Sequence, residues 1–230
     1  MNELFASSAM LGAALSIIAF QIGLYFRRKF DYPLVNPMII AVTIIIVLLQ
    51  FLNVEYESYN ESAKYITYFL TPTTVSLAIP LYEQIQILKK HKKAILAGVL
   101  AGVVSNLLCI FGLSLLFGLS HVEYVTLLPK SITTAIAISL TEEFGGVVTI
   151  TIVAITISGL LGNMFAEQAC KWFRIQSPIS QGIAIGTASH AMGTSKAMEM
   201  GEIQGAMGGL AIVVAGIMTT IGASIFANFI

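Results

Sequence analysis

Long stretches without any charged residue dominate the chain, and short polar links separate them. The uncharged stretches cover residues 4–26, 32–54, 65–82, 94–120, 144–166 and 203–230. A helix needs about 20 apolar residues to cross the hydrocarbon core of a bilayer, and most of these stretches reach that length. They are continuously apolar, whereas the strands of a membrane barrel alternate. The pattern therefore predicts an all-α, polytopic membrane bundle of seven or eight segments.

Composition supports this prediction. The chain is 57% hydrophobic and only 10% charged, whereas soluble domains carry about 25% charged residues. A net charge of zero gives no sign of nucleic-acid binding. Cys109 and Cys170 lack the spacing of metal ligands, so we expect them to be small packing residues. Arg27 and its basic neighbours follow the first apolar stretch instead of preceding it, so we expect that stretch to remain as a membrane helix.

Positive charge predicts the orientation in the membrane. Basic residues gather at 27–29, at 89–93 and at Lys171 with Arg174. The positive-inside rule predicts that these clusters mark cytoplasmic loops, with the N-terminus outside the cell. Two full crossings by 124–143 and 147–170 would place Lys171 outside, against that rule. We therefore predict a re-entrant or half-crossing segment at 124–143.

The stretch from 177 to 209 is unusually rich in small and hydroxyl residues. One interpretation is a helix that packs tightly through its glycines, as small residues spaced four apart favour. The other is an interrupted helix that lines a polar cavity, which His190 and Lys196 in the same stretch favour. We prefer the interrupted helix.

Lys130 is the most informative charged residue because it follows Pro129, a residue suited to begin a helix. An ammonium group near a helix N-terminus opposes the helix dipole unless an anion lies between them. Together with free backbone N–H groups and the hydroxyls of Ser131, Thr133 and Thr134, it predicts an anion site. The alternative is that Lys130 snorkels to the membrane interface.

Other polar residues also lie inside apolar segments, and charge within a membrane usually faces a cavity or a partner. His190 lies among Thr187, Ser189 and Thr194, whose hydroxyls can hydrogen-bond a small carboxylate, and we expect Thr187 and Ser189 to contact the substrate. His190 itself either binds the ligand or is a buried histidine satisfied by a backbone carbonyl. We expect coupling or structural polar roles for the charged residues Glu142, Glu143, Lys196 and Glu199. Lys196 and Glu199 are three apart and could simply pair.

A weak internal repeat relates residues 71–79 to residues 128–136. Thr73 and Thr74 fall where Ser131 and its neighbours fall in the second copy, so they join the predicted site. If 124–143 is half-crossing, the helices after the two copies run in opposite directions. The repeat would then be inverted, as in many secondary transporters.

No catalytic signature is present: the sequence has no phosphate-binding glycine loop, nucleophile elbow or paired-histidine zinc motif. We therefore expect a protein that is not an enzyme and that needs no cofactor or metal. Protons or sodium ions could still couple to its activity.

Three segments resemble the bacterial LrgB/CidB family, whose members are called antiholin-like proteins or autolysis modulators. The segments are 128–134 (LPKSITT), 142–146 (EEFGG) and 186–194 (GTASHAMGT). The resemblance covers nearly the whole chain. It implies control of murein hydrolase activity alongside a small holin-like membrane partner. The family is also related to the plastidal glycolate/glycerate translocator, and some bacterial relatives are linked to pyruvate uptake. It further implies an elevator-type fold with interrupted helices, and a homodimer by analogy with elevator carriers.

Our leading hypothesis is a secondary carrier of small monocarboxylates, such as glycolate, glycerate, lactate or pyruvate, in the bacterial inner membrane. The alternative is an antiholin-like regulator of autolysis. We expect one integral membrane domain over residues 1–230, with scaffold helices within 1–60. The interrupted core segments are expected around 63–88, 124–146 and 178–209.

Overall fold

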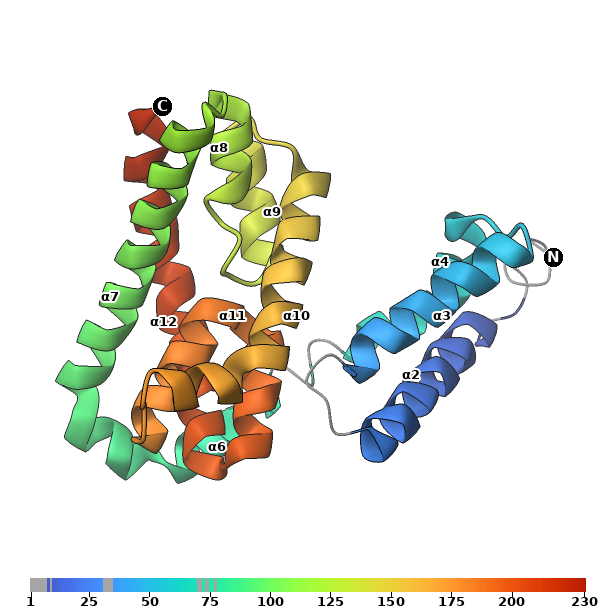
Figure 1. Ribbon diagram of the computed structural model, residues 1–230, viewed down its shortest axis with the longest axis horizontal. Coiled ribbons are helices and arrows are strands. Elements are labelled where there is room, and N and C mark those ends of the chain that lie inside the picture. The colour runs from blue at the N-terminus through green and yellow to red at the C-terminus, as the bar shows by residue number, and fades with distance from the viewer. Residues whose placement is uncertain (1–7, 9, 31–34, 70–71, 73–74, 77) are drawn as a thin grey trace. The chain divides into compact units, whose positions relative to one another are not determined.

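The computed structural model describes residues 8, 10–30, 35–69, 72, 75–76 and 78–230. Every regular element in this part of the chain is helical, which confirms the predicted all-α class (Figure 1). The chain divides into two compact units, Met1–Ser76 and Leu77–Ile230. Thr73 and Thr74, and with them much of the first copy of the predicted repeat, lie outside the described residues.

The first unit is a small set of apolar helices. Its elements are α2 (Leu11–Lys29), α3 (Pro37–Phe51), α4 (Tyr56–Ala63) and the 3-10 helix η1 (Lys64–Phe69). Asn36 caps α3 by accepting a hydrogen bond from the backbone N–H of Met38, with Pro37 at the first helical position. The backbone N–H of Gly12 donates to the Ser62 hydroxyl at 3.0 Å, which joins α2 to α4.

The second unit contains the longest helices. Its elements are α6 (Ala78–Glu83), α7 (Ile85–Phe117), α8 (His121–Leu127), α9 (Thr134–Glu143), α10 (Val148–Trp172), α11 (Pro178–Met200), α12 (Glu202–Phe226) and η2 (Ala227–Phe229). Among the described residues, three helices are long and apolar enough to cross a membrane. They are Lys89–Phe117, Val148–Trp172 and Glu202–Phe229. A helical membrane bundle is therefore the class of this fold.

The sequence predicted a loop at the basic cluster 89–93, and this prediction is wrong because the cluster is helical. Residues 89–93 lie inside the first turns of α7, which has 33 residues. At 1.5 Å per residue this helix is about 50 Å long, well beyond the ~30 Å hydrocarbon core. The lysines can therefore lie beyond the apolar layer while the helix continues.

The segment after α7 turns back on itself. Residues 128–133 interrupt the helix between α8 and α9, and α9 returns to the end of the unit from which α8 started (Figure 1). The Thr126 hydroxyl of α8 accepts from the backbone N–H of Val147, just before α10. Thr151 of α10 donates to the Thr126 carbonyl at 2.8 Å and lies 3.0 Å from the Thr141 hydroxyl of α9. This re-entrant first hairpin (121–143) confirms the predicted half-crossing segment.

α11 is also a hairpin. Ser189 (φ −136°, ψ 19°) and His190 (φ 42°, ψ −137°) have non-helical backbone angles. A Cβ on Gly193 would lie 2.9 Å from the carbonyl oxygen of Ile185, eight residues earlier. A straight helix would separate these residues by about 12 Å. The chain therefore reverses at 189–190, and we call α11 the second hairpin.

The second hairpin also packs through glycines. The stretch 177–209 therefore contains both the interrupted helix and the tight glycine packing that the sequence analysis considered. A Cβ on Gly182 would overlap the backbone of Gln204, and one on Gly186 would lie 2.5 Å from the carbonyl oxygen of Gly208. Small residues at these points let the backbones of α11 and α12 approach closely.

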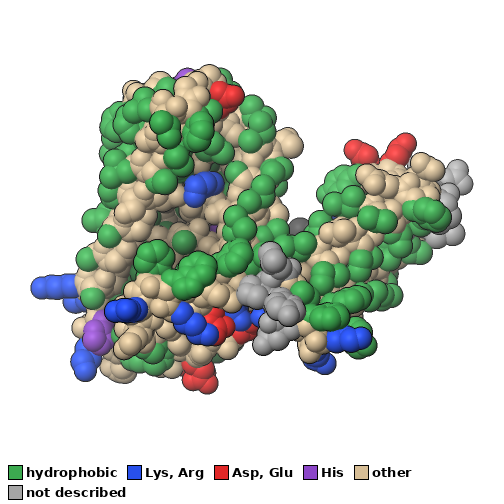
Figure 2. Space-filling view, in the orientation of Figure 1, with side chains coloured by type: hydrophobic (Ala, Val, Ile, Leu, Met, Phe, Trp, Pro, Cys, Tyr) green, Lys and Arg blue, Asp and Glu red, His purple; other side chains and the backbone are tan. Residues whose placement is uncertain are grey.

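The two hairpins enter from opposite ends of the second unit. Ala94 at the start of α7 and Ile175 after α10 line the same cavity, so residues 89–93 and Arg174 belong to one end. Lys and Arg side chains gather at this basic end (Figure 2). Tyr124 in the first hairpin donates to the carbonyl of Phe226 at the other end, 2.9 Å away.

This arrangement contains an inverted pair, while the repeat of 71–79 with 128–136 stays a prediction because much of its first copy lies outside the described residues. α7 and α10 run in opposite directions, as the re-entrant segment required. The elements that invert are the first hairpin with α10 and the second hairpin with α12 (Figure 1). They share no recognisable motif, because an inverted backbone can be built by different side chains.

Candidate functional site

The tip of the first hairpin and the first arm of the second hairpin line a cavity of about 620 Å³, which we call the tip cavity. α7, the tip of the first hairpin and the first arm of the second hairpin supply its walls. The polar residues among its lining are Asn106, Lys130, Ser131, Ser180 and Thr187. The hollow is visible on the face of the second unit in Figure 2.

Small residues form the α7 wall of this cavity. Ala94, Gly98, Gly102 and Asn106 are each four residues apart and therefore share one face of the helix. A Cβ on Gly102 would lie 2.8 Å from the Cγ2 atom of Thr187, closer than real side chains approach. Glycine at 102 therefore allows α7 and the second hairpin to approach at the depth of the polar residues.

Lys130 and its neighbours form a chain of hydrogen bonds at the first tip. The Lys130 Nζ donates to the Ser131 Oγ at 3.3 Å, and Ser131 donates to the Asn106 Oδ1 at 3.1 Å. In the part of the chain that the structure describes, no carboxylate forms an ion pair with Lys130. A half-buried ammonium without a counter-ion is costly, so this position favours an anionic ligand.

Thr187 supplies the opposite side of the cavity. It is only 7% exposed, and its hydroxyl has no hydrogen-bond partner among the described residues. A buried hydroxyl without a partner costs about 1–3 kcal/mol. Thr187 lines the tip cavity, but its hydroxyl oxygen is itself buried, so a ligand would reach it only after the side chain rotates.

The start of α9 adds backbone donors near the same tip. Thr133 occupies the N-cap position but its side chain makes no capping hydrogen bond. The first-turn N–H groups of a helix have no partner within the helix and carry partial positive charge. Thr133 is half-buried and Thr134 is exposed, and neither is among the residues that line the cavity.

His190 occupies a different environment from Lys130. Its side chain is 4% exposed, and its Nε2 lies 3.1 Å from the carbonyl oxygen of Ile155 on α10. This is the alternative in which a backbone carbonyl satisfies a buried histidine. Ser189 lines a separate, mainly apolar cavity of about 250 Å³ between α10 and α11. Thr194 is buried against Gly208 of α12, with no hydrogen-bond partner for its hydroxyl among the described residues.

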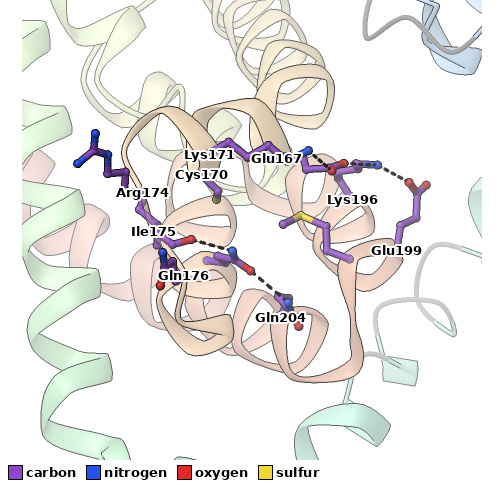
Figure 3. Close-up of a pocket in the computed structure, with 11 residues that line it drawn as sticks. Glu167, Cys170, Lys171, Arg174, Ile175, Gln176, Lys196, Glu199 and Gln204 are labelled. Carbon is purple, nitrogen blue, oxygen red and sulfur yellow. Dashed lines mark hydrogen bonds and ion pairs between the residues drawn. The ribbon is translucent and has the colours of Figure 1, made fainter.

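The remaining charged candidates lie near the ends of the second unit. Glu142 and Glu143 are exposed at the end of α9. Lys196 lies between Glu199, 3.0 Å away, and Glu167 of α10, 3.9 Å away (Figure 3). This cluster lines a cavity of about 720 Å³ at the basic end, and it confirms the predicted pairing of Lys196 with Glu199.

The structure thus brings Lys130, Ser131 and Thr187 together, whereas the other predicted residues that it describes do not line this cavity. It also adds Asn106, which the sequence analysis did not select. The available signal was a carboxamide in the middle of the uncharged stretch 94–120. Its distance of 24 residues from Lys130 hid the contact.

The fold and this site define a helical membrane protein in which two oppositely directed re-entrant hairpins enclose a polar cavity. The chain belongs to the LrgB-like family, because the sequence model of that family matches residues 16–229. It is 36% identical over 220 residues to the proteins named Antiholin-like protein LrgB from Bacillus cereus (strains B4264 and AH187) and Bacillus anthracis (strain CDC 684 / NRRL 3495). Each alignment covers 95% of this chain and 96% of the relative. No solved structure matches the chain.

Proposed function

We propose that this chain is a secondary carrier of small monocarboxylate anions of the glycolate, glycerate, lactate or pyruvate class, and not an enzyme. The observation that supports the proposal is the set of unsatisfied hydrogen-bond donors in the tip cavity. Lys130 has no carboxylate partner within the described residues, and the buried Thr187 hydroxyl has no partner there at all. A carboxylate accepts hydrogen bonds and carries the charge that Lys130 needs.

Transport would use the hairpins. The carboxylate would bind between Lys130 and Thr187, and the α9 N-terminus would add a favourable dipole. Helices broken near the midplane, with a substrate between their tips, are a recurrent plan of secondary transporters. The second unit would carry the site while the helices within 1–60 act as the scaffold, in an elevator-like cycle driven by protons or sodium ions. We also propose a homodimer in the bacterial inner membrane, with the N-terminus outside.

The names of the relatives favour a second candidate function. Proteins named Antiholin-like protein LrgB suggest a regulator of murein hydrolase activity and autolysis that acts with a small holin-like membrane partner. Such a regulator needs a partner surface but no anion cavity. The two functions are compatible if changes in carboxylate flux alter wall metabolism.

Uptake of labelled pyruvate or glycolate into proteoliposomes tests the carrier directly. We expect uptake by the wild type, loss in Lys130→Ala, and normal uptake in the matched control Lys64→Ala, whose lysine is exposed and pairs with Glu61. His190→Ala tests the second predicted cation. Wild-type uptake by Lys130→Ala would refute the role of Lys130, and no uptake by any protein would refute the carrier.

Thermal unfolding of the purified protein separates the two candidate functions. A ligand that binds only the folded state raises the unfolding temperature. Stabilisation by a small carboxylate supports the carrier. No stabilisation by any small acid, together with tight co-purification of a small membrane partner, supports the regulator.

A further inference from the structure

Asn106 has one hydrogen-bonding group committed to the protein and one left for the cavity. Its Oδ1 accepts from the Ser131 hydroxyl at 3.1 Å. Within the described residues its Nδ2 group has no hydrogen-bond partner, and the side chain lines the tip cavity. A carboxamide nitrogen carries two hydrogens and is a donor only.

The chain of hydrogen bonds determines which way the carboxamide faces. The Ser131 oxygen already accepts from the Lys130 ammonium, so the Ser131 hydrogen needs an acceptor. The Asn106 Oδ1 is that acceptor, which turns the Nδ2 group away from Ser131. The reversed carboxamide would leave the Ser131 hydrogen without this acceptor and would present an oxygen to an incoming anion.

Ser131 therefore acts on the ligand through Asn106. Its single hydrogen is donated to Asn106, so it has no donor left for an anion, and its role is to position Lys130 and Asn106. This differs from the direct ligand contact that the sequence suggested for Ser131. The groups left for a ligand are the remaining hydrogens of the Lys130 ammonium, the Asn106 amide and the Thr187 hydroxyl.

We propose that Asn106 is an anion-binding residue, oriented by Ser131 to donate its amide hydrogens to the substrate carboxylate, so that the site selects against cations. This inference rests on the proposed function, since it assigns a further contact at the same cavity. The inference requires a hydrogen-bond donor at position 106. A side chain of the same shape that can only accept hydrogen bonds should not bind the carboxylate.

Asn106→Asp is the sharpest test because it keeps the shape and replaces the donor by a carboxylate. At neutral pH the new carboxylate would pair with Lys130 and repel pyruvate. We expect the affinity for pyruvate, measured from thermal stabilisation of the purified full chain, to fall about tenfold to a hundredfold. Because the new carboxylate pairs with Lys130, it should stay ionised down to pH 5, so the loss of affinity should persist between about pH 8 and about pH 5.

Three further variants complete the test. Asn106→Leu removes the donor without adding charge and should lower the affinity at every pH. Asn228→Asp adds the same charge at an exposed position, where the Asn228 side chain donates to the Ser224 carbonyl, and should bind as the wild type does. Lys130→Met should abolish binding whatever the role of Asn106.

The outcomes separate this inference from the proposed function. Wild-type affinity in Asn106→Asp at neutral pH would overturn it, because an acceptor would then be tolerated. A loss of affinity in Asn106→Asp and Asn106→Leu that is accompanied by a lowered unfolding temperature without ligand would also overturn it, by indicating a structural role. If the wild type itself binds no carboxylate, the proposed function fails first.

Discussion

Gly102 brings α7 against the second hairpin, and adding one methyl group there tests whether this approach shapes the anion site. A Cβ at position 102 would lie 2.8 Å from the Thr187 Cγ2 atom, so one of the two must move. At Gly98, one turn earlier on the same cavity wall, a Cβ would lie 3.5 Å from the Ile183 Cγ2 atom, an ordinary contact. The two glycines therefore form a matched pair.

The magnitude follows from two opposing terms. Replacing glycine by alanine inside a helix stabilises it by about 1 kcal/mol. Overpacking a filled contact costs about 1–3 kcal/mol, and Thr187 can relieve it poorly because β-branched side chains are stiff. The helix term is shared by both variants and cancels in their difference. We therefore expect Gly98→Ala to be about 1–3 kcal/mol more stable than Gly102→Ala.

Thermal and denaturant unfolding in detergent measure this difference, with Gly112→Ala as a second control, since a Cβ there meets nothing within 4 Å. Displacement of Thr187 should also weaken the stabilisation by pyruvate in Gly102→Ala and leave it intact in Gly98→Ala. Equal stability of the two variants, with an unchanged response to pyruvate, would show that the close approach at Gly102 neither strains the packing nor shapes the site.

Other predictions concern the first hairpin and its ends. Thr151→Val removes the hydrogen bonds from α10 to the first hairpin and should cost about 1–3 kcal/mol of unfolding free energy, whereas Thr156→Val, at an exposed hydroxyl bonded within its own helix, should cost little. An equal loss of stability in both variants would show that the hydrogen bonds of Thr151 do not hold the first hairpin against α10. Cysteines at Ser120 and Arg174 should be labelled from opposite sides of the membrane. Labelling of both from the same side would mean that the segment 124–143 crosses the membrane fully. Hydrogen bonds from the backbone and hydroxyl of Ser120 lower the pKa of Glu123. The stabilisation by this carboxylate should therefore be complete above its ordinary pKa of about 4.3 and be lost as pH falls through the lowered value, and Glu123→Gln should remove this part of the pH dependence of the unfolding temperature.

Part of the candidate site could be predicted because its chemistry is local. Lys130 follows a proline and precedes hydroxyl residues, so the expectation of an anion site needed no tertiary contact. The structure places Lys130 at a helix break and in a cavity. Asn106 could not be predicted in this way, because its role depends on a contact between α7 and a hairpin tip.

His190 and Thr187 show the limit most clearly. They are three residues apart and look equally suited to a ligand in the sequence. The reversal at 189–190 turns the His190 ring onto the Ile155 carbonyl, while Thr187 lines the tip cavity. The direction of each side chain is set by the backbone angles at the break, which the residue types alone do not specify.

The amino-acid sequence by itself determined the helical membrane class and the re-entrant nature of 124–143, because each follows from the cost of placing charge or unpaired backbone in hydrocarbon. Only the tertiary structure decided that the second hairpin enters from the opposite end, that its first arm lines the same cavity as the first tip, and that Asn106 lines this cavity with Lys130. These features depend on contacts between distant segments, where close glycine packing and unsatisfied donors become visible only once the helices are in place.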